Sequence, residues 1–348
     1  ILLLLLLFSV LVVEAAASDE QESRRLSWWR EARFGLFIHW GLYAIPAGRW
    51  GDGSDHAEWI RHSAAIPREE YAELAALFDP EAYDPDRWCR LAKRAGMGYV
   101  VVTSKHHDGF CLWDSKHTTF DVGSTPCGKD LLEPLVEACR THGLRPCFYH
   151  SIMDWYHPDY LPRRPWERDA RPVADAQFDR YVEFLHAQVE ELLTGYGDIG
   201  LMWFDGQWES TWNHERGQAL YDLCRRLQPD GIVNDRVDVG RQGHSGRILE
   251  GYAGDYGTPE QQVPAEGLLG LDWETCLTMN AHWGWNEADQ AWKSSDELIR
   301  TLVDVVSKNG NLLLNVGPRA DGSFPPEAVE RLEAIGRWMD VHGEAIHG

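Results

Sequence analysis

After Trp29 the chain alternates short apolar runs with longer amphipathic stretches, and this alternation restricts the folds that it can adopt. A short apolar run between turn-forming residues is typical of a β-strand. Strands that alternate with helices build βα units around a parallel sheet. We therefore expect an α/β fold. The predicted strands are Phe34–Trp40, Tyr99–Ser104, Leu144–Tyr149, Ile199–Phe204, Gly231–Asn234, Ile248–Gly251, Cys276–Met279 and Leu312–Val316.

The stretches between these runs repeat apolar residues every three or four positions, as one buried face of a helix requires. Eight strands with interleaved helices favour a (β/α)8-like (TIM-type) barrel over an open doubly wound sheet. Little helical pattern follows the fifth to seventh strands, so we expect the barrel to be irregular there. The predicted helices are Arg87–Ala95, Asp130–Thr141, Phe178–Leu193, Arg216–Leu227, Glu297–Ser307 and Glu327–Val341.

The first residues have the pattern of a targeting segment. An apolar run from Ile1 to Val13 is interrupted only by Ser9 and is followed by Ala15-Ala16-Ala17-Ser18. This pattern predicts a signal peptide over residues 1–17, without its basic n-region, and a catalytic barrel over 18–348. An uncleaved membrane anchor is the alternative, but spanning a bilayer takes about 20 apolar residues. We expect export to a periplasm, a lysosome or the medium, with no stable membrane insertion after cleavage.

Charge and cysteine content exclude several classes of function. The 348 residues include 33 basic and 55 acidic side chains, a net charge of −22, which repels phosphate backbones. We therefore expect no nucleic-acid partner; the sequence does not fix the oligomeric state. The seven cysteines are scattered without a C-x-x-C pair, which argues against structural zinc and predicts buried thiols with at most one or two disulfides.

Polar clusters follow six of the predicted strands, where barrel enzymes place their chemistry. A strand end without a function has no need of His, Asp or Arg, so the repetition indicates an active site. The clusters are His39-Trp40, Lys105-His106-His107-Asp108, His150-Ser151, Asp205-Gly206, Asn234-Asp235-Arg236 and Asn315-Val316-Gly317-Pro318.

Two chemistries could use this set. A metal hydrolase could take ligands from His39, His106, His107, His150 and Asp205, but metal-binding spacings are missing. In an extended backbone His106 and His107 would also point in opposite directions. Glycoside hydrolysis needs two carboxylates, hydroxyl-binding side chains and aromatic rings. The tryptophans near the strand ends favour it, and we expect neither a metal nor a cofactor. These are Trp40, Trp203, Trp208, Trp283 and Trp285.

Several ordered motifs resemble glycoside hydrolase family 29, the α-L-fucosidases, over about residues 28–347. The two longest matching motifs are KHHDGF and NLLLNVGP. The motifs are FGLFIHWG (34–41), Glu58-Trp59, KHHDGF (105–110), YHS (149–151), DWYHP (154–158), WFDG (203–206), NDR (234–236) and NLLLNVGP (311–318).

The resemblance implies a retaining exo-α-L-fucosidase, which removes terminal α-L-fucose from oligosaccharides or glycoconjugates through a covalent fucosyl-enzyme intermediate. It implies that Asp205 is the nucleophile and that Phe37 and Trp283 contact the C6 methyl group of fucose. The other substrate-binding residues that it implies are His39, Glu58, His106, His107, Trp155 and Arg236.

The general acid/base is less well defined by the resemblance, because this residue varies across the family. Glu260, in a predicted loop after the sixth strand, matches the position that many members use. Glu58 competes with it, together with Glu209 and Glu266. A catalytically silent fucose-binding lectin on the same barrel is the alternative function. Family members usually carry a β-sandwich after the barrel, and we expect this chain to lack it.

Overall fold

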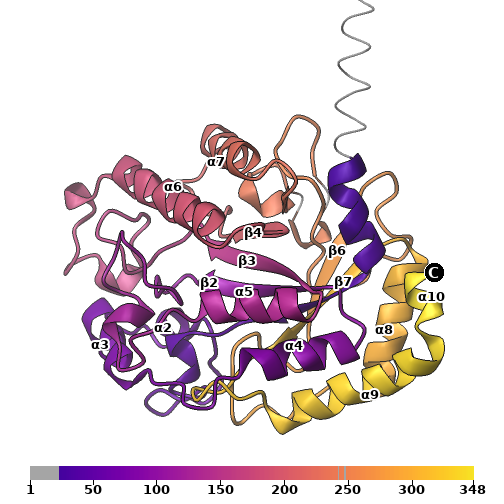
Figure 1. Cartoon of the computed structure of the whole chain (residues 1–348). Coiled ribbons are helices and arrows are strands. Elements are labelled where there is room, and N and C mark those ends of the chain that lie inside the picture. Colours follow the sequence, from indigo (N-terminus) through magenta and orange to yellow (C-terminus); the bar gives the residue numbers. More distant parts are fainter. Residues whose placement is uncertain (1–22, 242, 247) are drawn as a thin grey trace, which may run out of the picture.

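One curled parallel sheet organises the protein, which is described by a computed structural model over residues 23–241, 243–246 and 248–348 (Figure 1). Its strand order is β5-β4-β3-β2-β1-β7-β6, so the first strand pairs with both the second and the last. The strands are β1 (Phe34–Ile38), β2 (Tyr99–Lys105), β3 (Arg145–Ser151), β4 (Leu201–Asp205), β5 (Ile232–Val233), β6 (Glu274–Thr278) and β7 (Asn311–Val316). The predicted signal peptide lies outside the described residues.

Residues 255–261, which we call the closing segment, run between β5 and β6. The Asp255 N–H donates to the Val233 carbonyl on one side, and the Glu274 N–H donates to the Gly257 carbonyl on the other. Isolated parallel bridges join the segment to Asn234 and to β6. The segment therefore takes the place of a sixth strand, and the chain adopts a (β/α)8-like barrel.

The predicted sixth strand, Ile248–Gly251, is wrong. Ile248 pairs antiparallel with Arg241, and the residues after it turn. Leu249 lies 40% exposed at the surface, so the apolar character of this run does not reflect a place in the sheet. The closing segment was not predicted as a strand, because Gly257 and Pro259 are atypical of strands.

Helices cover the outer face of the sheet, as predicted. Helices α6 and α7 pack together beside β3 and β4, whereas α8 and α9 pack together at the opposite side (Figure 1). Within the described part of the chain no α-helix lies between β5 and β6, so the irregularity is confined to the fifth and sixth units. The helices are α2 (Ile60–Ser63), α3 (Arg68–Ala72), α4 (Pro85–Arg94), α5 (Leu132–Thr141), α6 (Phe178–Gly195), α7 (His214–Leu227), α8 (Ser295–Ser307), α9 (Pro326–His342) and α10 (Glu344–His347).

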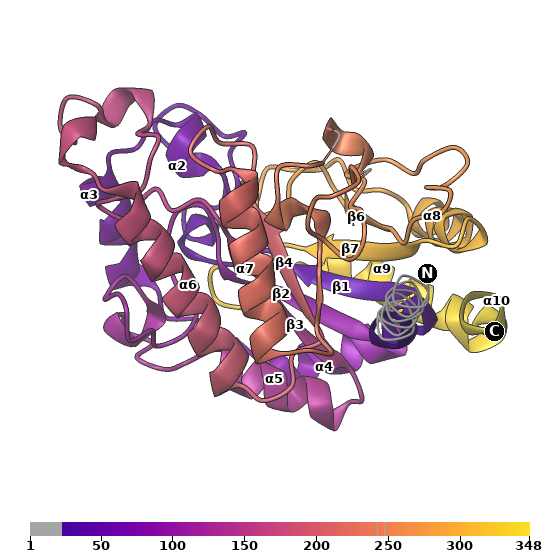
Figure 2. The same ribbon diagram turned by 90° about the horizontal axis from the view of Figure 1, so that it is seen from above.

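Large aromatic side chains fill the barrel interior, because alternate residues of each strand point inward. A helix over residues 23–32 adds Leu26 and Trp29 to this interior cluster. Figure 2 shows the helix at the end of the barrel from which β1 starts. The helix therefore covers the end of the barrel opposite to the one where the strands finish.

A buried carboxylate, Glu274 of β6, lies within this aromatic interior. The indole N–H groups of Trp29 and Trp203 each donate to it at 3.2 Å. The hydroxyl of Tyr99 also donates to it, and that of Tyr256 lies at 3.4 Å. Burial raises the pKa of Glu274 to about 7, although these donors oppose the shift.

All seven cysteines are free thiols, six of them buried. The closest approach among them brings the sulfur atoms of Cys89 and Cys139 to 3.6 Å, between α4 and α5. The expectation of buried thiols is confirmed for these six. No helix in the part of the chain that the structure covers is long and apolar enough to cross a membrane.

Candidate active site

A cavity of about 750 Å³ opens at the carboxyl ends of the strands. Eight of the ten predicted site residues line it, and His107 and Trp155 lie behind its wall. The eight are Phe37, His39, Glu58, His106, Asp205, Arg236, Glu260 and Trp283. The structure thus brings together side chains from almost every part of the barrel.

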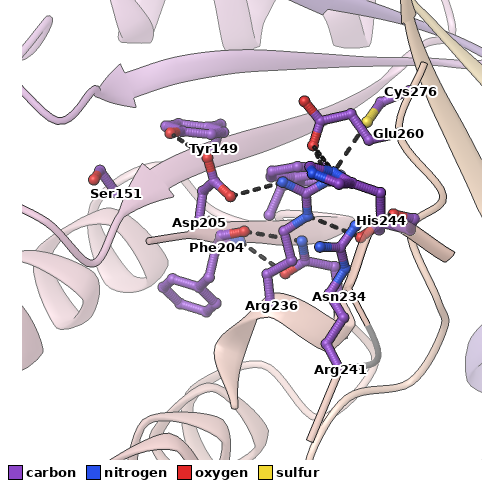
Figure 3. A network of polar contacts seen from close by, with 12 residues as sticks. Tyr149, Ser151, Phe204, Asp205, Asn234, Arg236, Arg241, His244, Glu260 and Cys276 are labelled. Carbon is purple, nitrogen blue, oxygen red and sulfur yellow. Dashed lines mark hydrogen bonds and ion pairs between the residues drawn. The ribbon is translucent and has the colours of Figure 1, made fainter. Parts of the chain in front are cut away.

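Asp205 is the last residue of β4 and lines the cavity. Figure 3 shows its carboxylate between Tyr149 and Arg236. Arg236 Nη1 donates to Oδ1 at 2.8 Å, and the Tyr149 hydroxyl donates to Oδ2 at 3.2 Å. His107 Nε2 lies 3.5 Å from Oδ2. These neighbours fix the orientation of the carboxylate and stabilise its negative charge.

Arg236 joins two carboxylates. It follows β5 in a short 3-10 turn, and its Nη2 donates to Glu260 Oε2 at 2.7 Å while Nη1 holds Asp205. The guanidinium lies 4.6 Å from the centre of the Trp203 ring. Burial alone would lower the pKa of Arg236, but the two carboxylates outweigh it and hold that pKa well above its usual range. Both acids therefore share one permanently charged partner.

Glu260 lies in the closing segment, not in a loop beyond a strand as predicted. The segment places its side chain beside Arg236, with 22% of that side chain exposed. His244 Nδ1 lies 3.9 Å from Glu260 Oε2, and the Glu260 N–H donates to the His244 carbonyl. Glu260 is therefore the more accessible of the two acids on Arg236, since the Asp205 side chain is 12% exposed.

The other carboxylates considered for acid/base catalysis have different surroundings. Glu58 is buried in the cavity wall just before α2, and the Gly284 N–H donates to it at 2.8 Å. Burial raises the pKa of Glu58, although that hydrogen bond opposes the shift. Glu209 lines the cavity and pairs with Arg164 at 2.6 Å. Glu266 does not line this cavity.

His39 is held in one tautomer. Asn315 donates through Nδ2 to the Trp283 carbonyl, so its Oδ1 is free to accept from His39 Nδ1–H at 2.7 Å. Burial lowers the pKa of His39 to about 4, although the Asn315 contact opposes the shift. The ring is therefore neutral near pH 7, and its Nε2 is an acceptor for a hydroxyl group.

The two adjacent histidines do not point in opposite directions. Strand β2 ends at Lys105 and the backbone turns, so the rings of His106 and His107 lie 4.2 Å apart on the same side. Burial lowers the pKa of both rings well below the usual histidine value. His150 instead contacts Ser104 at 2.9 Å and does not line the cavity.

Trp155 supports the wall of the cavity. Its ring packs against Trp59 at 5.2 Å and against His107 at 5.5 Å. It is 2% exposed, so Trp59, not Trp155, forms the cavity surface there.

Sequence reasoning missed several lining residues. Tyr149 belongs to the motif YHS (149–151), but the prediction took only the residues after the strand, which begin with its neighbour His150. The period of two in β3 could have found it, because Tyr149 and Ser151 share the inward face. Trp59 also belongs to a matching motif, Glu58-Trp59, from which only Glu58 was chosen. No comparable signal identified Gln207 or Arg241.

The arrangement suits an uncharged polyhydroxylated ring. Neutral imidazoles offer hydroxyl partners, Phe37 and Trp283 offer apolar surface with ring centres 5.8 Å apart, and two carboxylates meet on Arg236. Within the described residues no group of three His, Cys, Asp or Glu side chains is placed to bind a metal ion.

Comparison with known proteins gives consistent matches. A family model described as alpha-L-fucosidase matches residues 12–344. The tissue alpha-L-fucosidase of Mus musculus is 34% identical over 346 residues, which cover 92% of this chain and 71% of that protein. The alpha-L-fucosidase isoenzyme 1 of Paenibacillus thiaminolyticus superposes with a TM-score of 0.86 at 42% identity, covering 94% of this chain and 78% of that one. A Bacteroides thetaiotaomicron alpha-L-fucosidase of family GH29, solved as a trapped covalent intermediate, has a TM-score of 0.82 at 35% identity and coverages of 93% and 76%.

Proposed function

Because this chain belongs to the α-L-fucosidase family, we propose that its cavity hydrolyses terminal α-L-fucosides with Asp205 as nucleophile and Glu260 as general acid/base. The protein is a retaining glycoside hydrolase, and the lectin alternative is not supported. The observation that carries the residue assignment is the single guanidinium of Arg236, which holds both carboxylates. Retaining enzymes need their two carboxyl groups only about 5–5.5 Å apart, and a shared guanidinium favours such close spacing.

In the first step a carboxylate oxygen of Asp205 attacks the anomeric carbon. The glycosidic C–O bond breaks, and the leaving oxygen takes a proton from Glu260. The products are a β-linked fucosyl ester of Asp205 and the released alcohol. Tyr149 and Arg236 hold the attacking carboxylate in place.

In the second step Glu260 removes a proton from water as the water oxygen attacks the anomeric carbon. The ester bond to Asp205 breaks and its carboxylate is restored, so the product is α-L-fucose. Two inversions at one carbon give net retention.

Arg236 matches the charge changes in both steps. Before attack, Asp205 is ionised and Glu260 carries the proton, so the pair has one negative charge. After attack Asp205 is a neutral ester and Glu260 has become ionised, so the negative charge has moved to the other end of the same guanidinium. A fixed cation between the two sites stabilises both arrangements without rearrangement.

Neutral imidazoles and apolar rings bind the fucose. His39 Nε2 accepts a hydrogen bond from a hydroxyl group, and His106 provides a further polar contact. His107 supports this wall from behind, 3.5 Å from Asp205. Phe37 and Trp283 form the apolar surface for the C6 methyl group. A site built to pair with particular hydroxyl groups discriminates strongly against a stereoisomer that leaves those groups unpaired.

Glu58 is the second candidate for the acid/base, because burial raises its pKa and a general acid must carry a proton at working pH. Against it, Glu58 accepts from the Gly284 N–H and does not contact Arg236. We therefore keep Glu260 as the assignment.

Azide capture tests both roles. With Asp205→Gly, turnover of an aryl α-L-fucoside should fall at least a thousandfold, and azide should restore it with formation of the inverted β-fucosyl azide. With Glu260→Ala, an activated aryl fucoside should still form the ester, and azide should yield the retained α-fucosyl azide, since azide needs no base.

The matched control is Glu209→Ala, which removes another cavity carboxylate. It should yield no fucosyl azide beyond the wild-type amount. Retained azide product from Glu58→Ala, with Glu260→Ala near wild type on a disaccharide, would move the acid/base role to Glu58.

We also propose that the mature protein is exported. The apolar run of residues 1–13 and the alanines that follow it support this proposal. Expression of the full chain in a secreting host, followed by N-terminal sequencing, should find the mature protein outside the cytoplasm with a start near Ser18. Uncleaved protein retained with the membrane would contradict export by cleavage.

A further inference from the structure

The fucose-binding side chains occupy only part of the cavity. Those assigned above come from the strand ends, the closing segment and residues 58 and 283. The remaining wall is made chiefly by two stretches, residues 207–212 after β4 and residues 239–241 and 243–244 after β5. Cavities of about 300–1,000 Å³ hold drug-sized ligands. At about 750 Å³ this cavity has room beyond one monosaccharide.

An exposed tryptophan marks this outer part. Trp208 lines the cavity and is 50% exposed, and it is the one tryptophan among the strongly exposed large apolar residues in the described part of the chain. The His107 and Trp208 rings are nearly perpendicular with their centres 6.0 Å apart, so the indole lies directly beside the fucose site. Val239, 37% exposed, adds apolar surface from the other stretch. Exposed apolar surface in a functional cavity indicates a binding site.

The charges of the outer wall are already paired within the protein. Arg241 lies 3.2 Å from Asp235 and donates to the Thr258 carbonyl, while Glu209 pairs with Arg164. Gln207, which is 5% exposed, lines the cavity and has an Oε1 atom without a hydrogen-bond partner. An aromatic face beside neutral polar groups fits an uncharged sugar ring, which has an apolar C–H face and hydroxyl groups at its edge.

We propose that the outer cavity, walled by residues 207–212, 239–241 and 243–244, binds a neutral pyranose to which the fucose is attached, and that Trp208 stacks on its apolar face. This inference rests on the fucosidase function above. It identifies the substrate as a fucosylated glycan whose second sugar is held by the enzyme. His107 lies beside both Asp205 and the Trp208 ring, so the second sugar lies beside the bond that is cleaved.

Two substrates separate this site from the fucose site. Fluoride is too small to reach Trp208, so α-L-fucosyl fluoride reports on the fucose site alone. Trp208→Ala should lower kcat/KM at least tenfold for a fucosyl-N-acetylglucosamine disaccharide and leave fucosyl fluoride within twofold of wild type. Trp208→Phe, which keeps a ring, should retain most of the activity on the disaccharide. Trp338→Ala, a partly buried tryptophan of α9, is the control and should alter neither substrate.

Transfer provides an independent measurement. With fucosyl fluoride as donor, added N-acetylglucosamine should capture part of the fucosyl-enzyme in the wild type, and the ratio of transfer to hydrolysis should fall about tenfold in Trp208→Ala. An equal loss on fluoride and disaccharide would overturn the proposal, because Trp208 would then act through His107. If a sialylated or sulfated acceptor captured the fucosyl-enzyme better than N-acetylglucosamine, the proposal that the second sugar is neutral would be overturned. If the wild type failed to hydrolyse fucosyl fluoride at all, the fucosidase function itself would be refuted.

Discussion

Tyr149 donates a hydrogen bond to the carboxylate of Asp205. Replacing Tyr149 with phenylalanine removes this hydrogen bond without changing the net charge of the site. Tyr149→Phe should lower kcat for an aryl fucoside about tenfold, because the attacking carboxylate loses one of the contacts that orient it. Tyr196→Phe removes a similar tyrosine–carboxylate hydrogen bond, to Asp130, away from the cavity. That variant should keep wild-type kcat. Equal losses in the two variants would mean that Tyr149 matters only for stability.

Residue types and motifs were enough to predict most of the site. Asp205 and Arg236 follow two different strands, and the structure brings them together, as expected of strand ends. Glu260 joins them from the closing segment, which was not predicted. What the sequence could not predict was the backbone turn after Lys105, which puts His106 and His107 on one side. It also could not predict that Trp59 would cover Trp155, because that depends on how two connections pack.

At the scale of elements, the closing segment depends on a glycine. A Cβ atom on Gly257 would lie 1.9 Å from the carbonyl oxygen of Gly246, so the segment could not remain in place beside β6. Gly257→Ala should therefore lower kcat about a hundredfold or more by displacing Glu260, since a shift of about 1 Å at a reacting group can cost that much. Far-UV circular dichroism should remain unchanged.

Gly195→Ala is the matched control, because nothing lies within 4 Å of its added methyl group at the end of α6. It should keep full activity. Wild-type activity in Gly257→Ala would show that the segment tolerates displacement and does not fix the acid/base.

The helices can be predicted from their sequences more accurately than the closing segment can. The six predicted helices begin and end within about two residues of the expected positions, because an amphipathic face extends over several turns. The helix over residues 23–32 was not predicted. The closing segment spans few residues and contains both Gly257 and Pro259, so its extended form comes from hydrogen bonds to β5 and β6 and not from its own propensity.

For the molecule as a whole, Glu274 connects the helix over residues 23–32, β2, β4 and the closing segment to β6. Its pKa is about 7 in the folded protein and about 4.5 ordinarily, so the folded state holds a proton that the unfolded state releases between these values. Stability from this group is complete below pH 4.5 and is lost as the pH rises through 7. A shift of this size corresponds to roughly 3 kcal/mol.

Urea unfolding of Glu274→Gln measures this contribution, because the variant cannot titrate at that position. Relative to Glu274→Gln, the wild type should lose about 3 kcal/mol in the free energy of unfolding between pH 4.5 and pH 8. A difference that stays constant across this range would mean that Glu274 has the same proton affinity folded and unfolded.

The pairing of β1 with β7 limits when the sheet can be completed during synthesis. Phe34 aligns with Leu312, so β1 leaves the ribosome long before β7, which covers its second edge. Contacts between such distant parts of a chain form slowly, and an open strand edge invites pairing with other molecules. Until Asn311–Val316 has been synthesised, therefore, the nascent chain presents an unprotected β edge, and its safe production depends on what shields that edge in the meantime.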